Sequence, residues 1–226
     1  MRFGFSKKPR VLIFGSSGFG KVVLETLIAT KQFVILGFVD GSDQSEGIRC
    51  YKSLGSDEDI ARIAHETKAT SAVIAVGDNH KRSLIETRIR SLAPSLNFPV
   101  VIHPTACISD DVVIGEGTIV LPRIVIGPDC KFGRFCLINT AASIGHDSQF
   151  ADYSSVAPGV TVGGKVAVGE FSAICLGANI IHGVTIGPQT VVGAGAVVVR
   201  DQKENVVTFG IPSTVKRQRK PGDPYL

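Results

Sequence analysis

Apolar residues recur at every sixth position through the second half of the chain. From Ile102 to Val198, seventeen successive positions spaced by six are aliphatic or phenylalanine, without a break. A helix requires a period near 3.6 and a half-buried strand a period of 2, so neither explains the pattern. A fixed longer period indicates a repeat architecture. The sequence therefore predicts short strands joined by corners, three hexapeptides making one triangular turn of 18 residues that stacks on the next.

Two regularities accompany this period. Four residues after each apolar position the residue is small or β-branched, which indicates a second inward-facing row. Cys130 and Cys136 fall in that row and are interpreted as packing residues. Glycine often follows the apolar position directly, which predicts a tight corner whose backbone geometry a side chain would strain. These glycines are Gly115, Gly127, Gly133, Gly145, Gly163, Gly169, Gly187 and Gly193.

The first half of the chain alternates compact apolar runs with helical segments. Ser56 and Asp59 form a plausible capping box for the middle helix, which runs through Glu66. The order strand, helix, strand, helix, strand predicts a Rossmann-like α/β domain with a parallel sheet. Strands are expected at 10–14, 33–39 and 71–76, and further helices at 21–31 and 81–92.

Four segments follow from these patterns. Residues 1–9 are expected to be an N-terminal tail, residues 10–98 a βαβ domain, residues 99–205 a parallel β-helix and residues 206–226 a C-terminal tail.

The βαβ domain carries a glycine-rich turn where a ligand is expected. Ligands of parallel sheets bind beyond the carboxyl ends of the strands, here 15–20, 40–41 and 77–79. A glycine turn before a helix offers backbone N–H groups to a phosphate. Its spacing, G-x-x-G-x-G, differs from the dinucleotide fingerprint, which disfavours a nicotinamide-dependent oxidoreductase. The alternative is a turn needed only for close packing of strand and helix.

Composition limits the cellular location, cofactors and partners that we expect for this protein. The chain has 226 residues, 44% of them hydrophobic, and a net charge of +4 whose basic surplus lies mainly near the ends. The run 216–220 is expected to be a solvated terminus or a phosphate contact. Five cysteines without metal-like spacing favour reduced thiols and no metal site. No apolar run reaches the length of a membrane span, so we expect a cytoplasmic protein with no membrane or nucleic-acid partner.

Several motifs in fixed order resemble one family. They are Ile-Phe-Gly-Ser-Ser-Gly-Phe-Gly at 13–20, Gly-Phe-Val-Asp at 37–40, Ala-Val-Gly-Asp-Asn at 75–79, Asn-Thr-Ala-Ala-Ser-Ile-Gly-His-Asp at 139–147, Val-Gly-Ala-Gly-Ala-Val-Val at 192–198 and Gly-Ile-Pro at 210–212. Over roughly residues 10 to 215 the chain resembles the sialic acid O-acetyltransferases and UDP-N-acetylbacillosamine N-acetyltransferases, which are hexapeptide-repeat enzymes. The resemblance implies a left-handed β-helix, a homotrimer with active sites between adjacent β-helices, and acetyl-CoA as co-substrate.

The resemblance also implies which residues bind the substrates. The nucleotide end of the sugar is assigned to the βαβ domain, and Asn139 is placed near the acceptor group of the sugar. In the family the pantetheine groove of acetyl-CoA matches Leu176 and Ala194, and a histidine that contacts acetyl-CoA aligns with Ser155. Lys216 and Arg217 are candidate partners of the CoA phosphates. The expected nucleotide-sugar residues are Ser17, Gly18, Phe19, Asp40, Gly41, Gly77 and, at the same strand end, Asn79.

Of the five histidines, His146 matches the family's catalytic base. Attack of an amine or hydroxyl on a thioester requires removal of a proton, and imidazole is suited to that near neutral pH. Asp147 follows it and can fix the tautomer of the ring, although some relatives carry the longer glutamate there. Phe19 and Ser155 depart from the family, which commonly has histidine at both positions. His182 lies two 18-residue turns beyond His146, too far to serve the same reacting atom.

The remaining histidines are expected to have other roles: His65 at the surface, His80 in a loop and His103 in a structural hydrogen bond. The predicted activity is N-acetylation of the 4-amino group of a UDP-linked 4-amino-4,6-dideoxy sugar. The alternatives are O-acetylation of sialic acid or another surface-polysaccharide sugar, and a non-catalytic scaffold of the same fold.

Overall fold

The computed structural model describes residues 7–41 and 47–225, which form two compact units. One unit contains residues 7–41, 47–76 and 85–99, and the other contains residues 77–84 and 100–225. Helix α3 (Asn79–Leu92) therefore begins in the second unit and ends in the first. The predicted boundary at 98–99 misses the segment 77–84, which packs with the β-helix.

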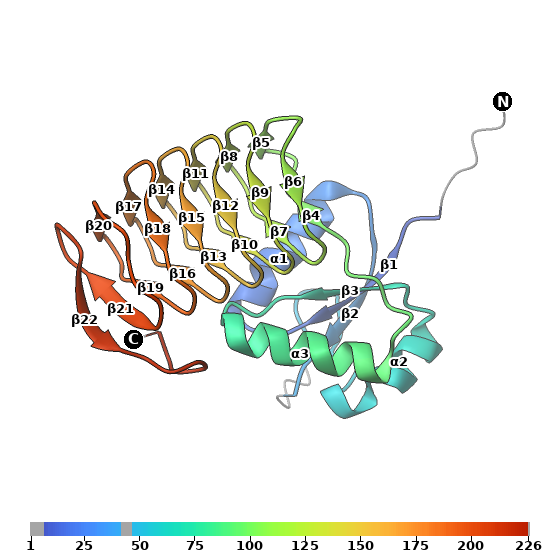
Figure 1. Ribbon diagram of the computed structural model, residues 1–226. Helices are drawn as coiled ribbons and strands as arrows, with labels where there is room; N and C mark the ends of the chain where they lie inside the picture. The colour runs from blue at the N-terminus through green and yellow to red at the C-terminus, as the bar shows by residue number, and fades with distance from the viewer. Residues whose placement is uncertain (1–6, 42–46, 226) are drawn as a thin grey trace. The chain divides into compact units, whose positions relative to one another are not determined.

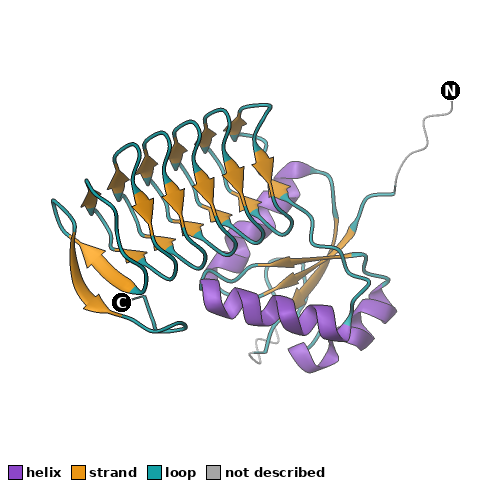
Figure 2. Ribbon diagram, viewed as in Figure 1, coloured by secondary structure: helices purple, strands orange, loops and turns teal. Residues whose placement is uncertain are grey.

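The first unit is built on a parallel three-stranded sheet with the order β2-β1-β3 (Figures 1 and 2). The Rossmann-like arrangement predicted from the alternating pattern is confirmed. Its central strand is buried along Val11 to Phe14, because both neighbours and both faces cover it. The elements are β1 (Arg10–Phe14), α1 (Gly18–Thr30), β2 (Val34–Val39), the 3₁₀ turn η1 (Asp57–Asp59), α2 (Ile60–Thr67) and β3 (Ser71–Ile74).

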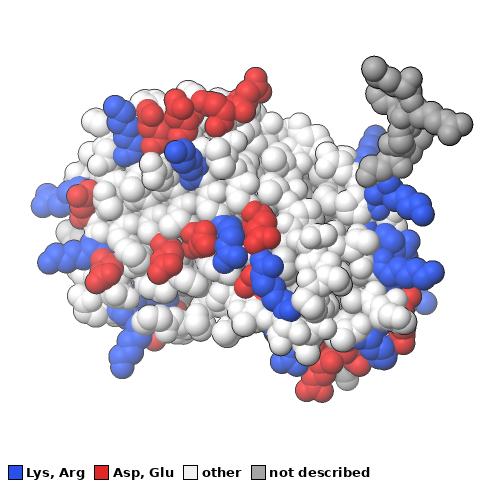
Figure 3. Space-filling model, turned by 45° about the vertical axis from the view of Figure 1, so that its right-hand side comes forward, with Lys and Arg blue, Asp and Glu red and all other residues white. Residues whose placement is uncertain are grey.

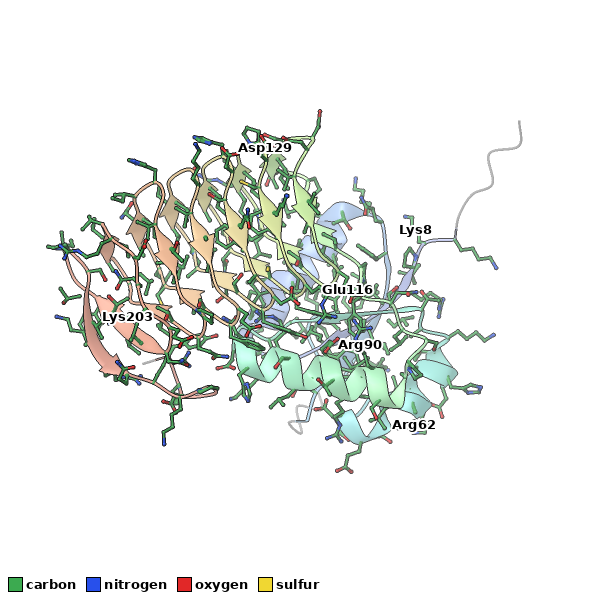
Figure 4. The ribbon with its side chains drawn as sticks, in the orientation of Figure 1. Lys8, Arg62, Arg90, Glu116, Asp129 and Lys203 are labelled. Atoms are coloured by element: carbon green, nitrogen blue, oxygen red, sulfur yellow. The ribbon has the colours of Figure 1, made fainter. Side chains whose placement is uncertain are left out.

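The helices differ from the predicted ranges mainly at their starts. Helix α1 starts at Gly18, three residues before its predicted start, because the glycine turn itself forms the first helical turn. Ser56 caps η1, and its hydroxyl accepts a hydrogen bond from the Glu58 amide at 3.3 Å. On the outer face of α2, Arg62 pairs with Asp59 and Glu66, at 3.0 Å in each case (Figure 4).

The second unit is a solenoid of two-residue strands, the left-handed parallel β-helix expected for this chain. Successive turns pair in parallel with a register of 18 residues, as in Ile138 opposite Val156. Face 1 has the order β22-β21-β19-β16-β13-β10-β7-β4, face 2 the order β20-β17-β14-β11-β8-β5, and face 3 the order β18-β15-β12-β9-β6 (Figure 1). The strands are β4 (Val101–Ile102), β5 (Cys107–Ile108), β6 (Val113–Ile114), β7 (Ile119–Val120), β8 (Val125–Ile126), β9 (Lys131–Phe132), β10 (Leu137–Ile138), β11 (Ser143–Ile144), β12 (Gln149–Phe150), β13 (Ser155–Val156), β14 (Thr161–Val162), β15 (Ala167–Val168), β16 (Ala173–Ile174), β17 (Asn179–Ile180), β18 (Thr185–Ile186), β19 (Val191–Val192) and β20 (Val197–Val198).

The period of six is confirmed, because each of its seventeen positions is the second residue of one of these strands. From Val120 onward every one of these side chains is buried, whereas Ile102 at the open end of the coil is 38% exposed. The second inward row is confirmed as well, with Cys130 and Cys136 at 0% and 1% exposure. Burial raises the pKa of both thiols.

Glycines follow the buried positions as predicted, but the predicted reason, a backbone geometry that only glycine adopts easily, is wrong. The left-handed backbone lies at the third residue after each buried position, at fourteen successive places from Gly117 to Gly195, and nine of these carry a side chain. The glycines that directly follow the buried positions are needed because the next turn is too close. A Cβ on Gly145, for example, would lie 2.5 Å from the Gly164 nitrogen.

Hydroxyl groups inside the coil bridge neighbouring turns. The Ser172 hydroxyl donates to the Gly187 carbonyl at 2.8 Å and accepts from the Thr190 amide at 3.1 Å. This interior hydroxyl thereby has hydrogen-bond partners within the protein, which removes most of the cost of burying it. Two interior rings, Phe132 and Phe150, stack at 4.8 Å.

The predicted C-terminal tail is largely structured. Strand β21 (Val206–Phe209) extends face 1 beside β19, and β22 (Thr214–Gln218) pairs with it in antiparallel fashion. The sequence pattern did not indicate β22, because the strand is exposed along its whole length and carries no apolar alternation. Arg219 belongs to the run predicted to be a solvated terminus or a phosphate contact, and it is only 6% exposed. Within residues 7–41 and 47–225, no helix has the length and apolar character needed to cross a bilayer.

Candidate functional site

His146 projects from the corner between faces 2 and 3, immediately after strand β11. Its side chain is 58% exposed, and its Nδ1 lies 2.6 Å from the Asp147 carboxylate. Asp147 occupies one of the left-handed corner positions, with φ of 59°. This sharp turn folds its carboxylate back toward the preceding ring. The neighbouring pair predicted from the sequence therefore forms a direct contact.

The contact fixes the proton on the imidazole. A carboxylate only accepts hydrogen bonds, so Nδ1 of His146 must be the donor. In the neutral ring Nε2 is then left with its lone pair, which is the state that a general base requires.

Gly164 lies directly against the Nε2 end of this ring. A Cβ built on Gly164 would be 2.6 Å from Nε2, 2.8 Å from Cε1 and 2.9 Å from Cδ2 of His146. Gly164 is one 18-residue turn further along the same corner, so only a residue without a side chain leaves room for the ring here. The sequence analysis did not single out this glycine, although the spacing of 18 from His146 identifies its place.

Carboxylates repeat along a neighbouring line of the same corner. Asp111, Asp129 and Asp147 are one turn apart, and the Asp111 carboxylate accepts the Asp129 amide at 2.9 Å. Asp129 lies on the outer side of the coil beside β8 (Figure 4). Acidic side chains gather along this edge of the β-helix in the space-filling view (Figure 3). Three acidic residues therefore lie on this corner up to Asp147, and Lys165 follows one turn beyond it.

The residues expected to hold acetyl-CoA lie on another edge. Leu176 and Ala194 are exposed at the corner between faces 1 and 2, after β16 and β19, and are one turn apart. Ser155 begins β13 on face 1 and is half-buried. Asn139 lies at the same corner as Leu176, two turns earlier, and its Oδ1 accepts the Thr140 amide at 2.8 Å. The width of face 2 separates these residues from His146 within one chain.

The glycine turn of the first unit presents an open helix start. Ser17 is the N-cap of α1 but makes no capping hydrogen bond with its side chain, and the first turn contains no acidic residue. A Cβ on Gly18 would meet nothing within 4 Å, whereas one on Gly20 would lie 2.4 Å from the Gly15 carbonyl oxygen. Close packing therefore explains Gly20 but not Gly18, and Phe19 beside it is half-buried.

Asp40 supports this turn directly. Its Oδ2 accepts hydrogen bonds from the Ser16 amide at 2.6 Å and the Ser16 hydroxyl at 2.5 Å. Gly41 follows it at the exposed end of β2. Because β1 and β2 are parallel neighbours, these residues share one edge of the sheet with the glycine turn. Ser16 is a partner that the sequence analysis missed.

Gly77 and Asn79 belong to the segment that packs with the β-helix. Gly77 is exposed, and a Cβ there would meet nothing within 4 Å. Asn79 is 1% exposed, and its Nδ2 donates to the carbonyls of Phe171 and Ser172 at 3.3 and 3.1 Å. Its Oδ1 accepts from Arg82 at 2.7 Å. These contacts give Asn79 a structural role, which the prediction of a substrate contact did not foresee.

Two hollows in the surface lie elsewhere. One, of about 460 Å³, is lined by Lys21, Glu25 and Arg49 among others, and one of about 420 Å³ lies over face 3. No predicted site residue lines either hollow. Within the described parts of the chain no cluster of three or more His, Cys, Asp or Glu side chains is placed to hold a metal ion.

Comparisons with known proteins identify the family to which the chain belongs. Residues 10–89 match the family model of the PglD N-terminal domain. A histidine-to-asparagine variant of perosamine N-acetyltransferase from Caulobacter crescentus, solved with CoA and GDP-perosamine, is 33% identical with a TM-score of 0.87, covering 92% of this chain and 97% of that one. The acetyltransferase domain of PglB from Neisseria gonorrhoeae, solved with acetyl coenzyme A, is 27% identical with a TM-score of 0.84, covering 93% and 100%.

WeeI from Acinetobacter baumannii, at 24% identity and a TM-score of 0.74 over 91% of this chain and 99% of that one, shares the fold. A comparison with curated proteins gave no match. The identity and coverage of the Caulobacter enzyme decide the class: the chain belongs to the hexapeptide-repeat sugar acetyltransferases. It is an acetyl-CoA-dependent sugar N-acetyltransferase.

Proposed function

We propose that this enzyme transfers the acetyl group of acetyl-CoA to the 4-amino group of a nucleotide-linked 4-amino-4,6-dideoxy sugar, with His146 as the general base. The observation that carries this proposal is the 2.6 Å contact between Nδ1 of His146 and Asp147, which leaves Nε2 as the proton acceptor. The variant structures of the Caulobacter enzyme, in which a histidine is replaced by asparagine or alanine, support an important histidine in that relative.

The proposed reaction is a direct transfer. The neutral amine attacks the thioester carbonyl carbon, a C–N bond forms, and Nε2 of His146 takes the proton that the nitrogen loses. The C–S bond then breaks, and the imidazolium of His146 returns the proton to the CoA thiolate, which leaves as the thiol. Backbone N–H groups are the expected donors to the oxyanion. General-base assistance contributes on the order of 10² to 10⁴ in rate, and holding the two substrates together supplies much of the remainder.

The local charge favours an amine over a hydroxyl acceptor. An amino sugar reaches the site with a positive charge near neutral pH, and Asp129 lies one turn before Asp147 on the corner that carries His146. Such a pair attracts a cation. A neutral hydroxyl gains nothing from it. O-acetylation of sialic acid or another surface-polysaccharide sugar remains the second candidate, favoured by the family resemblance of the 139–147 motif.

The nucleotide is proposed to bind at the start of α1. The backbone N–H groups there face no side-chain cap, and the space above Gly18 is open. Phosphates bind such helix starts because the N–H groups and the helix dipole both favour an anion. Asp40 would keep the turn in shape through Ser16. The predicted base is uracil, and since the Caulobacter relative was solved with a GDP-sugar, the assay must include both.

A homotrimer is proposed to complete the active site. His146 and the expected acetyl-CoA residues Leu176 and Ala194 lie on different edges of one β-helix. If the edge with His146 of one subunit faces the edge with Leu176 and Ala194 of the next, base and thioester come together between the chains. Threefold closed symmetry provides three such sites from one kind of contact.

Replacement of His146 by alanine tests the proposed base. We expect kcat to fall at least about 100-fold with the oligomer intact, because the proton acceptor is lost. His182→Ala is a matched control, since His182 lies on the same corner two turns away and should be replaceable without loss. Near-normal turnover by the His146 variant would rule out the assignment.

Acceptor identity requires a separate measurement. Release of CoA thiol would be followed with UDP- and GDP-linked 4-amino-4,6-dideoxy sugars and with sialic acid. Turnover confined to hydroxy sugars would replace N-acetylation by the second candidate. Absence of thiol release with every acceptor would favour a non-catalytic scaffold.

A further inference from the structure

A fully buried arginine holds the start of α3 on the β-helix. Arg82 is 0% exposed, and its Nε donates to the Phe135 carbonyl at 2.9 Å while Nη2 donates to the Tyr153 carbonyl at 3.1 Å. Nη2 also reaches Asn79 Oδ1, and Nη1 reaches the Gly77 carbonyl at 3.2 Å. Burial lowers the pKa of Arg82 to about 10, so the side chain stays charged at neutral pH. One cation therefore fixes the loop before α3 and two turns of the coil.

The acceptors belong to one corner of the β-helix. Phe135, Tyr153, Phe171 and Gln189 occupy successive left-handed positions 18 residues apart. The first three rings stack with centroids 5.4 and 4.9 Å apart. Three side chains donate to the four backbone carbonyls of this corner: Arg82 to the first two, Asn79 to the third and Arg219 to the fourth, the last at 2.7 Å.

The C-terminal segment contacts the start of α3 and face 1 through Tyr225. The Tyr225 hydroxyl accepts the Asn79 amide, the first of α3, at 2.8 Å. Its ring packs near Val191 and Val207 of face 1 and lies 5.7 Å from the Arg219 guanidinium. Burial raises the pKa of Tyr225 to about 12, so the hydroxyl stays neutral.

The same segment supports the other side of the loop. Gly222, in a left-handed conformation with φ of 81°, lies under the ring of His80, and a Cβ there would be 3.2 Å from Cδ2. Arg219 and Lys220 tie the segment to itself, because Arg219 donates to the Asp223 carbonyl at 2.6 Å and the Lys220 amide donates to the Asp223 carboxylate at 2.7 Å. The last residues thus form a closed turn that contacts both Asn79 and His80.

We propose that residues 219–225 act as a clasp that positions the loop 77–80 for the nucleotide sugar. The inference rests on the proposed function and on the expectation, from the family resemblance, that Gly77 of this loop binds the nucleotide sugar. Tyr225 occupies the first amide of α3, and the Asp78 carboxylate accepts the Lys81 amide at 2.8 Å. Backbone N–H groups at the start of α3 are therefore bonded to side chains of the protein, in contrast to those at the open start of α1. The clasp sets the position of the exposed Gly77 backbone, and Tyr225 is a positioning residue with no part in the chemistry.

Tyr225→Phe removes only the hydroxyl, and deletion of residues 221–226 removes the closed turn. We expect the KM for the nucleotide sugar to rise about three- to tenfold in the first variant and more than about tenfold in the second, with the KM for acetyl-CoA unchanged. Tyr51→Phe, which removes a hydroxyl in the other unit, is the matched control. Equal changes in both KM values, or no change in either, would overturn the clasp.

Hydrogen exchange separates this outcome from failure of the proposed function. Wild-type turnover of nucleotide sugars decides the function by itself. The exchange rate of the amides of residues 77–84 decides the contact independently of any substrate, and we expect it to increase about tenfold or more in Tyr225→Phe without a change in the rest of the β-helix. Unchanged exchange in that segment would overturn the clasp even if the enzyme is active.

Discussion

Replacing Gly164 by alanine should separate catalysis from stability. The new Cβ would lie 2.6 Å from Nε2 of His146, whereas ordinary contacts begin at 3.4 Å. The imidazole must therefore move by roughly 1 Å, and it can do so because the side chain is 58% exposed. A displacement of about 1 Å at a reacting group can cost on the order of 10²-fold in rate, which corresponds to about 2.7 kcal/mol of transition-state stabilisation.

The free energy of unfolding should change little. The backbone of Gly164 is outside the left-handed region, so alanine is sterically allowed in the main chain. Reduced freedom of the unfolded chain would contribute about 0.4–1 kcal/mol in favour of alanine, against the strain of the displaced ring. The expected result is a kcat about 100-fold lower with a Tm close to that of the wild type.

A double-mutant cycle supplies the control. In the His146→Ala background the ring that obstructs the methyl group is absent, so Gly164→Ala should cost nothing further. The assay is initial-rate release of CoA thiol at saturating substrates, with circular dichroism to follow unfolding. Equal losses in both backgrounds, or a kcat within about threefold of the wild type, would refute the steric argument.

Two further predictions concern the fold. Arg82→Met should lower the free energy of unfolding by roughly 3–5 kcal/mol, because several buried acceptors lose their donor at about 1–3 kcal/mol each, measurable by urea titration; a loss below about 1 kcal/mol would contradict the hydrogen-bond network. In the folded protein, iodoacetamide should label the exposed Cys50 and Cys107 much faster than Cys130 and Cys136, because burial raises the pKa of the last two thiols. Peptide mass spectrometry measures the labelling. Comparable labelling of all four thiols would show that the inward row is misplaced.

The β-helix was predictable because its signal is long and unbroken. Seventeen apolar positions at one spacing leave a single arrangement of strands, and the structure places each of them at the second residue of a strand. The corners were not predictable in the same way. Residues as different as Arg123, Phe135 and Tyr153 occupy the left-handed positions, so no residue type marks them. The backbone there follows from closing the triangle and not from local preference.

The contacts of the candidate site also differ in how far the sequence could predict them. His146 and Asp147 are neighbours in sequence, so their contact was within reach of a motif. The bond between Asn79 and Tyr225 spans 146 residues, and nothing in either segment indicates the other. Strand β22 was missed because an exposed edge strand needs no apolar pattern, and its charged residues suggested a free terminus.

The left-handed backbone at Asp147 places a limit on how this protein can be improved. Left-handed residues other than glycine cost roughly 1–2 kcal/mol each, and aspartate tolerates the conformation better than most. Screening for heat resistance would favour glycine at position 147, because it relieves the main chain. The same exchange would release the imidazole from its carboxylate partner. Thermal stability and turnover are thus opposed at position 147. Aspartate there costs some backbone energy, but its carboxylate holds the proposed base in one tautomer.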